Sequence, residues 1–164
     1  MKYLFTSEAF FAVVATPFFA AYWSGTGGAV DWSARVPPLV LVCYLLAQGA
    51  LYWALKYRQY SQGAALPVWF PGLFRFFRGS NVVSLAVTAV ALAIAASRGA
   101  DTIDLAWASG LWVFALLEHV NYYHLQLMYD TRSALRRLRL TRRLRTPMLA
   151  DDLRSAVKPG SMTA

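Results

Sequence analysis

Polar side chains that could do chemistry gather near the end of the last long apolar segment of the chain. The string there reads EHVNYYHLQ, from Glu118 to Gln126. On a helix, which turns about 100° per residue, Tyr122 shares the face of Glu118. An ionisable side chain inside an apolar helix is by default a candidate functional residue. The predicted intramembrane polar site comprises Glu118, His119, Asn121, Tyr122 and Gln126, with Gln48 from another apolar segment as a partner for Glu118.

Glu118 lies nine residues before Leu127, and so roughly 13 Å inside the expected end of its helix. A charged carboxylate at that depth costs at least about 2.5 kcal/mol. Glu118 must therefore carry a proton, accept a hydrogen bond from Tyr122 or His119, or pair with a basic residue. The alternative to a functional site is a structural contact between helices, at about 0.6 kcal/mol each. A pair of carboxylates for acid–base work would require Glu8 to approach Glu118.

The two histidines are expected to face apart. Measured from Glu118 on a continuous helix, His119 lies about 100° to one side and His124 about 120° to the other, some 140° apart. One helix then cannot offer both rings to one metal or one haem. Since the chain has only these histidines and one cysteine, a structural zinc site is excluded, and no metal or cofactor is predicted. Haem held by His119 or His124 across a dimer is kept as an alternative.

The elements that would position these residues are transmembrane helices. Hydrophobic residues make up 58% of the 164 residues, and charged residues only 15%. A membrane-crossing helix needs about 20 mostly apolar residues, and four stretches qualify, at approximately 3–23, 36–57, 81–97 and 103–127. We therefore predict an all-α membrane protein, a four-transmembrane-helix bundle over residues 1–130 with a basic cytoplasmic tail over 131–164. The first stretch contains Glu8 and is expected to be a retained helix, with a signal peptide as the alternative.

The distribution of basic residues predicts the orientation. Of the 16 lysines and arginines, only Arg35 and Arg98 lie in the loops that follow the first and third stretches. The other 14 lie at the N-terminus, around the loop between the second and third stretches, and in the tail. Because cytoplasmic loops carry the excess of basic residues, both termini are predicted to be cytoplasmic, in a multi-pass protein of the plasma (inner) membrane.

Two further segments are expected to meet the cytoplasmic face of the membrane. Residues 67–78, PVWFPGLFRFFR, are too apolar for a solvated loop and too interrupted by proline to span, so an interfacial segment is predicted, with a loop packed on the helix ends as the alternative. After the fourth span, a basic helical extension is predicted. The arginines expected to contact anionic lipid or a partner are Arg75, Arg78, Arg136, Arg137, Arg139, Arg142, Arg143 and Arg145. Each contributes about 1 kcal/mol near an anionic leaflet, and nucleic acid is not a favoured partner.

Three functions agree with these observations. The favoured one is a small integral membrane protein that acts as an accessory, assembly or scaffold subunit of a membrane complex, with a protein partner or as a homo-oligomer. It rests on the small size, the absence of a catalytic motif and the basic tail. The alternative is a small membrane enzyme or transporter that uses the Glu118 cluster on a lipidic or protonatable substrate. The third is a haem carrier. Whether the chain is an enzyme stays open at this point.

Overall fold

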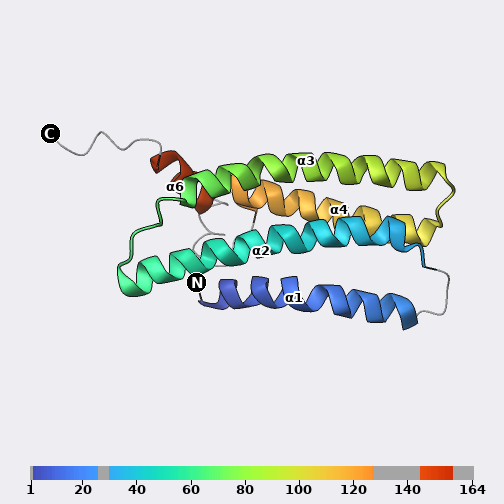
Figure 1. Ribbon diagram of the computed structural model, residues 1–164, viewed down its shortest axis with the longest axis horizontal. Coiled ribbons are helices and arrows are strands. Elements are labelled where there is room, and N and C mark those ends of the chain that lie inside the picture. Colours follow the sequence, from blue (N-terminus) through green and yellow to red (C-terminus); the bar gives the residue numbers. More distant parts are fainter. Residues whose placement is uncertain (1, 26–29, 128–144, 157–164) are drawn as a thin grey trace, which may run out of the picture.

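The computed structural model describes residues 2–25, 30–127 and 145–156. These residues form five helices and no strand: α1 (Lys2–Gly25), α2 (Trp32–Gln62), α3 (Phe70–Ser97), α4 (Thr102–Tyr123) and α6 (Met148–Ser155). Figure 1 shows the four long helices side by side along the long axis, with the short α6 at the end where α3 begins. The prediction of an all-helical protein is confirmed.

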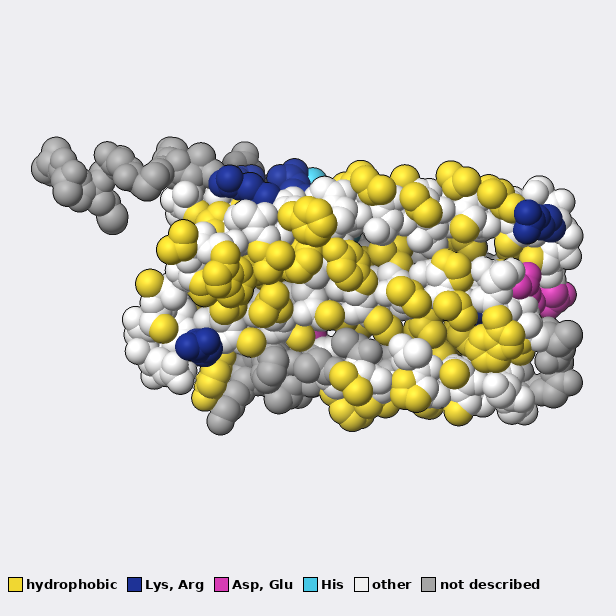
Figure 2. All heavy atoms as spheres, in the orientation of Figure 1, with side chains coloured by type: hydrophobic (Ala, Val, Ile, Leu, Met, Phe, Trp, Pro, Cys, Tyr) yellow, Lys and Arg dark blue, Asp and Glu magenta, His cyan; other side chains and the backbone are white. Residues whose placement is uncertain are grey.

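Three of these helices are long and apolar enough to cross a membrane, namely α2, α3 and α4. They contain 31, 28 and 22 residues, against the roughly 20 that a bilayer requires. Figure 2 shows apolar side chains over the middle of the molecule, while lysines and arginines gather mainly at the end where α3 begins. This distribution is that of a membrane protein, as the composition predicts.

The central helix α2 packs against α1, α3 and α4. It begins after Asp31, whose side chain accepts hydrogen bonds from the backbone N–H groups of Ser33 and Ala34, as N-cap residues do. The Ser33 hydroxyl donates to the same carboxylate and thereby lowers the pKa of Asp31. The helix ends at Gly63, where φ is +63°, a left-handed conformation that glycine adopts without the penalty of a Cβ atom.

The third helix begins earlier than predicted. It starts at Phe70 rather than Asn81, because Pro71 occupies its first turn, where a missing N–H costs no hydrogen bond. Phe70 and Phe74 are fully buried and pack with Tyr52 of α2 in one apolar cluster. Residues 70–78 are therefore the first turns of α3 and no separate element, and the boundary predicted at Asn81 is wrong. An interfacial position for residues 67–78 stays a prediction.

The fourth helix ends earlier than predicted, at Tyr123 rather than Leu127. The backbone N–H groups of His124 and Leu125 both donate to the carbonyl of Val120, which closes the last turn. Beyond it, the Asn121 side chain accepts a hydrogen bond from the backbone N–H of Leu127 at 2.8 Å. Residues 124–127 are therefore not helical, whereas most of the predicted helical extension into the arginine track, from residue 128 to residue 144, lies outside the described residues. Five arginines of that track, Arg136, Arg137, Arg139, Arg142 and Arg143, lie outside the described residues.

The short helix α6 was not expected in the tail. Its Leu149 and Leu153 are buried in the same cluster as Phe70 and Phe74. Asp152 fixes it to α2, since the Lys56 ammonium lies 2.9 Å from the carboxylate and the Tyr52 hydroxyl donates to it at 2.8 Å. Part of the predicted basic tail is therefore a short helix that packs against the bundle and is held there by the carboxylate of Asp152.

Candidate functional site

A half-buried carboxylate joins three helices in the half of the bundle where α1 begins. Oε1 of Glu8 on α1 accepts hydrogen bonds from the Tyr122 hydroxyl of α4 and, at 3.1 Å, from Nε1 of Trp53 on α2. Its second oxygen, Oε2, is buried and meets no hydrogen-bond donor among the described residues. A charged carboxylate at the centre of a membrane helix costs about 2.5–3.5 kcal/mol, which these two bonds offset in part. The cluster holds α1 to α2 and α4 and keeps one unused acceptor.

Gly49 of α2 makes this cluster possible. A Cβ atom at this position would collide with Oε2 of Glu8 and with the hydroxyl and ring of Tyr122. Small residues allow membrane helices to approach closely, and here the missing side chain leaves room for the polar groups of two neighbouring helices.

Glu118 adds a second carboxylate to the same interface. It lies one turn before Tyr122 on α4 and hydrogen-bonds with Asn121. Its charge acts on both Glu8 and Tyr122, so the two carboxylates lie in the same part of the bundle, and their pairing for acid–base work stays a prediction. The structure brings together the predicted residues Glu118, Asn121 and Tyr122. It adds Glu8 as a member of the site, for which the only sequence signal is an isolated ionisable residue in the first apolar stretch.

Gln48 is not the partner of Glu118. Its side-chain amide forms two reciprocal hydrogen bonds of 2.9 Å with the amide of Asn81 on α3. The Tyr123 hydroxyl of α4 donates to the same Gln48 oxygen at 3.4 Å. Asn81 is fully buried, whereas its predicted place at the start of a helix gave it no role. Because α3 begins at Phe70, Asn81 lies inside the bundle, where a buried amide requires a partner.

The two histidines lie together, contrary to the prediction that they face apart. Their ring centroids are 5.4 Å apart, and the His119 ring also lies 5.2 Å from that of Tyr123. The predicted separation assumed a helix that continues through His124, but α4 ends one residue earlier and His124 turns back. His119 is buried, and its Nδ1 has no hydrogen-bond partner among the described residues. Haem ligation by either ring stays a prediction.

The opposite end of the bundle contains a buried ion pair. Nε of Arg35 on α2 lies 2.5 Å from Oδ1 of Asp104 on α4, and both residues are buried. The Arg35 guanidinium also lies 5.1 Å from the ring centroid of Trp23 on α1. Arg35 was assigned to a loop, yet it is an internal link between three helices. Removal of one partner of a buried pair leaves an uncompensated charge, so pairs of this kind are sensitive to single substitutions.

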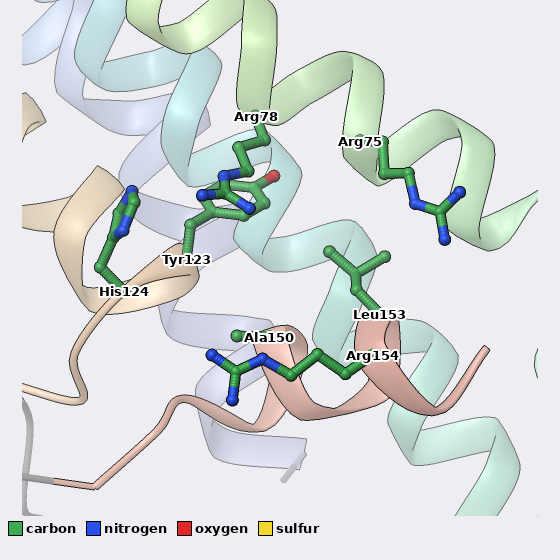
Figure 3. A pocket seen from close by; sticks show the side chains of 7 residues that line it. All are labelled: Arg75, Arg78, Tyr123, His124, Ala150, Leu153 and Arg154. Carbon is green, nitrogen blue, oxygen red and sulfur yellow. The ribbon is translucent and has the colours of Figure 1, made fainter. Parts of the chain in front are cut away.

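Arg75 and Arg78 lie at a pocket where α3 begins, α4 ends and α6 folds back. The cavity is about 340 Å³ and is lined by Arg75, Arg78, Tyr123, His124, Ala150, Leu153 and Arg154. Figure 3 shows Arg75 and Arg78 entering from α3, Tyr123 and His124 from the end of α4, and the other three side chains from α6. The structure thus joins two arginines predicted to contact lipid or a partner to a third that the prediction did not include.

Gln126 and Arg145, two further predicted residues that the structure describes, do not line this pocket. Gln126 follows α4, and its backbone N–H donates to the carbonyl of Arg145 at 2.9 Å. Within residues 2–25, 30–127 and 145–156, no three His, Cys, Asp or Glu side chains are grouped as a metal site requires. No family model, no curated protein and no solved structure matches this chain.

Proposed function

We propose that this chain is a small integral membrane protein that serves as an accessory, assembly or scaffold subunit of a membrane complex. It crosses the plasma membrane four times, with both termini in the cytoplasm, and it presents basic side chains to anionic lipid or to a partner there. The observation that supports this best is the division of polar side chains. Three polar pairs inside the bundle join one helix to another, namely Glu8 with Tyr122, Arg35 with Asp104 and Gln48 with Asn81. Arg75 and Arg78, in contrast, remain exposed at the basic end.

The contacts of α1 favour a fourth span. Along α1, Glu8 bonds with Trp53, Thr16 with Cys43 at 3.3 Å, and Trp23 stacks over Arg35. These contacts extend over about 22 Å of helix axis at 1.5 Å per residue. An apolar helix that lies antiparallel along a membrane-crossing helix over this length shares its depth in the bilayer.

The topology is tested with reporter fusions placed after Gly27, Gly63, Gly99 and Ala164. We expect the reporters to indicate outside, inside, outside and inside, because the basic residues concentrate on one side. A fusion after Gly27 that indicates inside would show that α1 does not cross the membrane. Any other alternation would contradict the orientation.

The role as a subunit is tested in native membranes. The protein is cross-linked in native membranes and solubilised in mild detergent. The mass and the visible spectrum of the resulting assembly are then measured. We expect a discrete assembly that contains this 18.3-kDa chain and a second polypeptide in fixed ratio. A monomer or a pure homo-oligomer would contradict the proposal, and a Soret band would favour the haem carrier instead.

A second candidate function has one specific observation in its favour. Oε2 of Glu8 is buried without a hydrogen-bond donor among the described residues, and a second carboxylate, Glu118, acts on the same cluster. Such a pair is suited to accept and release a proton, or to bind a basic substrate, within the membrane. A small enzyme or transporter of this kind would lose its activity, but not its fold, when either carboxylate is replaced by glutamine.

A further inference from the structure

The pocket at the basic end of the bundle collects positive charge that the described protein does not neutralise. None of its seven lining residues is acidic. Arg75 and Arg78 are exposed, and their guanidinium groups form no ion pair or hydrogen bond with a described residue. Arg154 lies 4.0 Å from Asp151, but both side chains are mostly exposed, so solvent screens this pair. Guanidinium groups in this arrangement suit an oxygen-rich anion such as phosphate, which arginine binds with two hydrogen bonds.

The other walls of the pocket are apolar and limit its size. Ala150 and Leu153 of α6 lie opposite Arg75 and Arg78 of α3, and the Tyr123 ring closes the side nearest α4 (Figure 3). At about 340 Å³, the cavity lies near the lower limit of ligand pockets, which is about 300 Å³. It therefore suits a headgroup and the first carbons that follow it, and does not enclose a whole lipid.

An exposed apolar stripe leads from this pocket along α3. Residues four apart are neighbours on a helix, each about 40° further round than the last, and Arg78 is followed at this spacing by Val82, Ala86, Val90 and Ile94, all of which are exposed. A soluble phosphate compound would make no use of this stripe. A phospholipid would place its phosphate at the arginines and its acyl chains along these side chains.

From this combination we propose that the pocket formed by Arg75, Arg78, His124 and Arg154 binds the phosphate-bearing headgroup of an anionic phospholipid. The inference deepens the proposed function and rests on its orientation, which places this end at the cytoplasmic surface. A phosphate monoester carries about −1.5 to −2 charges at pH 7, against one for a diester. Because three arginines line the pocket, phosphatidic acid should bind more tightly than phosphatidylglycerol, and phosphatidylcholine least.

The test compares two variants of the full chain that lose the same number of positive charges. R75Q/R78Q removes two arginines from the pocket, whereas R58Q/R98Q removes two exposed arginines outside it. Binding of phosphatidic acid, phosphatidylglycerol and phosphatidylcholine is titrated by native mass spectrometry of the purified protein. At about 1 kcal/mol per arginine, we expect the pocket variant to lose roughly 30-fold in affinity for phosphatidic acid. The control should lose no more than about threefold, since any contribution of the arginine track is the same in both.

Equal losses in the two variants would show a general effect of charge and would overturn the proposal, as would no loss in either. Inorganic phosphate and glycerol phosphate are added as competitors. Displacement of the lipid by either at the concentration of the lipid itself would assign the pocket to a soluble phosphate and overturn the lipid assignment.

A second measurement decides the matter if R75Q/R78Q does not fold. Phosphatidic acid with a photoreactive acyl chain is cross-linked to the wild-type protein, and the labelled peptides are identified. We expect labels on the α3 stripe from Val82 to Ile94. Labels spread evenly over α1 to α4 would overturn the proposal. Because both measurements use the isolated protein, they can fail while cross-linking in native membranes still finds a complex, and the reverse also holds.

Discussion

Two polar clusters inside the bundle differ in their balance of donors and acceptors. Between Gln48 and Asn81 each amide donates to the other, so every side-chain nitrogen and oxygen of the pair has a partner. Around Glu8, two donors meet on one oxygen while the other oxygen has no partner among the described residues. The balanced pair can only stabilise, whereas the acceptor-rich cluster can still take up a proton or another donor. Proximity of polar residues within a membrane helix therefore does not by itself mark a site, whereas an unmatched buried acceptor gives a reason to propose one.

The largest effect is expected from Gly49→Ala, which acts on the acceptor-rich cluster alone. The added Cβ meets Glu8 and Tyr122, and overpacking of this kind costs about 1–3 kcal/mol. The matched control is Gly110→Ala on α4, where a Cβ meets nothing within 4 Å and alanine favours the helix by up to about 1 kcal/mol. Thermal unfolding in mild detergent measures both. Equal melting temperatures would mean that the helices do not approach as described.

A double-mutant cycle tests whether the amide pair is balanced. Asn81→Leu leaves the amide of Gln48 buried without its partner, at a cost of about 1–3 kcal/mol. The double variant Gln48→Leu/Asn81→Leu should recover most of this loss, because no buried amide is then left without a partner and only the long contact from the Tyr123 hydroxyl is lost. Unfolding by a denaturing detergent gives the change in the free energy of unfolding for Gln48→Leu, for Asn81→Leu and for the double variant. Additive losses would refute the reciprocal bonds.

A smaller effect is expected when one donor is removed from the acceptor-rich cluster. Tyr122→Phe keeps the ring but removes the hydroxyl that donates to Glu8. Hydrogen bonds between membrane helices contribute about 0.6–1.7 kcal/mol, so we expect a loss in this range, with the bond from Trp53 retained. Tyr22→Phe, at a side chain that is 49% exposed, is the control and should change little. A loss above about 3 kcal/mol would indicate that Tyr122 is indispensable to the fold.

The smallest effect on folding is expected from Glu118→Gln, which keeps the shape of the side chain but cannot carry charge. If the proposed scaffold function is correct, the variant remains monodisperse, unfolds within about 0.5 kcal/mol of the wild type, and still joins the complex. Size-exclusion chromatography and cross-linking in native membranes measure this. A folded variant without cellular function would instead support the proton-handling alternative, and Glu8→Gln should then behave in the same way.

Several residues show why the candidate site was predictable only in part. Glu118, Asn121 and Tyr122 lie together as their spacing on one helix predicts. The hydrogen bond of Glu118 is with Asn121 rather than the predicted Tyr122 or His119, because Tyr122 donates to Glu8. Gln48 was assigned the wrong partner, because no sequence pattern records which residues of two helices meet. His119 and His124 were predicted to face apart because the helix was assumed to continue through both. The sequence does not show that α4 ends at Tyr123, where the backbone N–H groups of His124 and Leu125 both donate to the carbonyl of Val120. Asp152 was counted with a basic tail until α6 was found folded against Lys56 and Tyr52.

By itself, the sequence determined that this is a helical membrane protein, and it predicts four spans and the side on which the ends lie. These properties add up residue by residue along the chain, so local composition carries them. Only the tertiary structure decided that Glu8 meets Tyr122, that Gln48 meets Asn81 and that α6 completes a cationic pocket. These contacts depend on where each helix ends and on how it is rotated, which all the helices determine together when they pack.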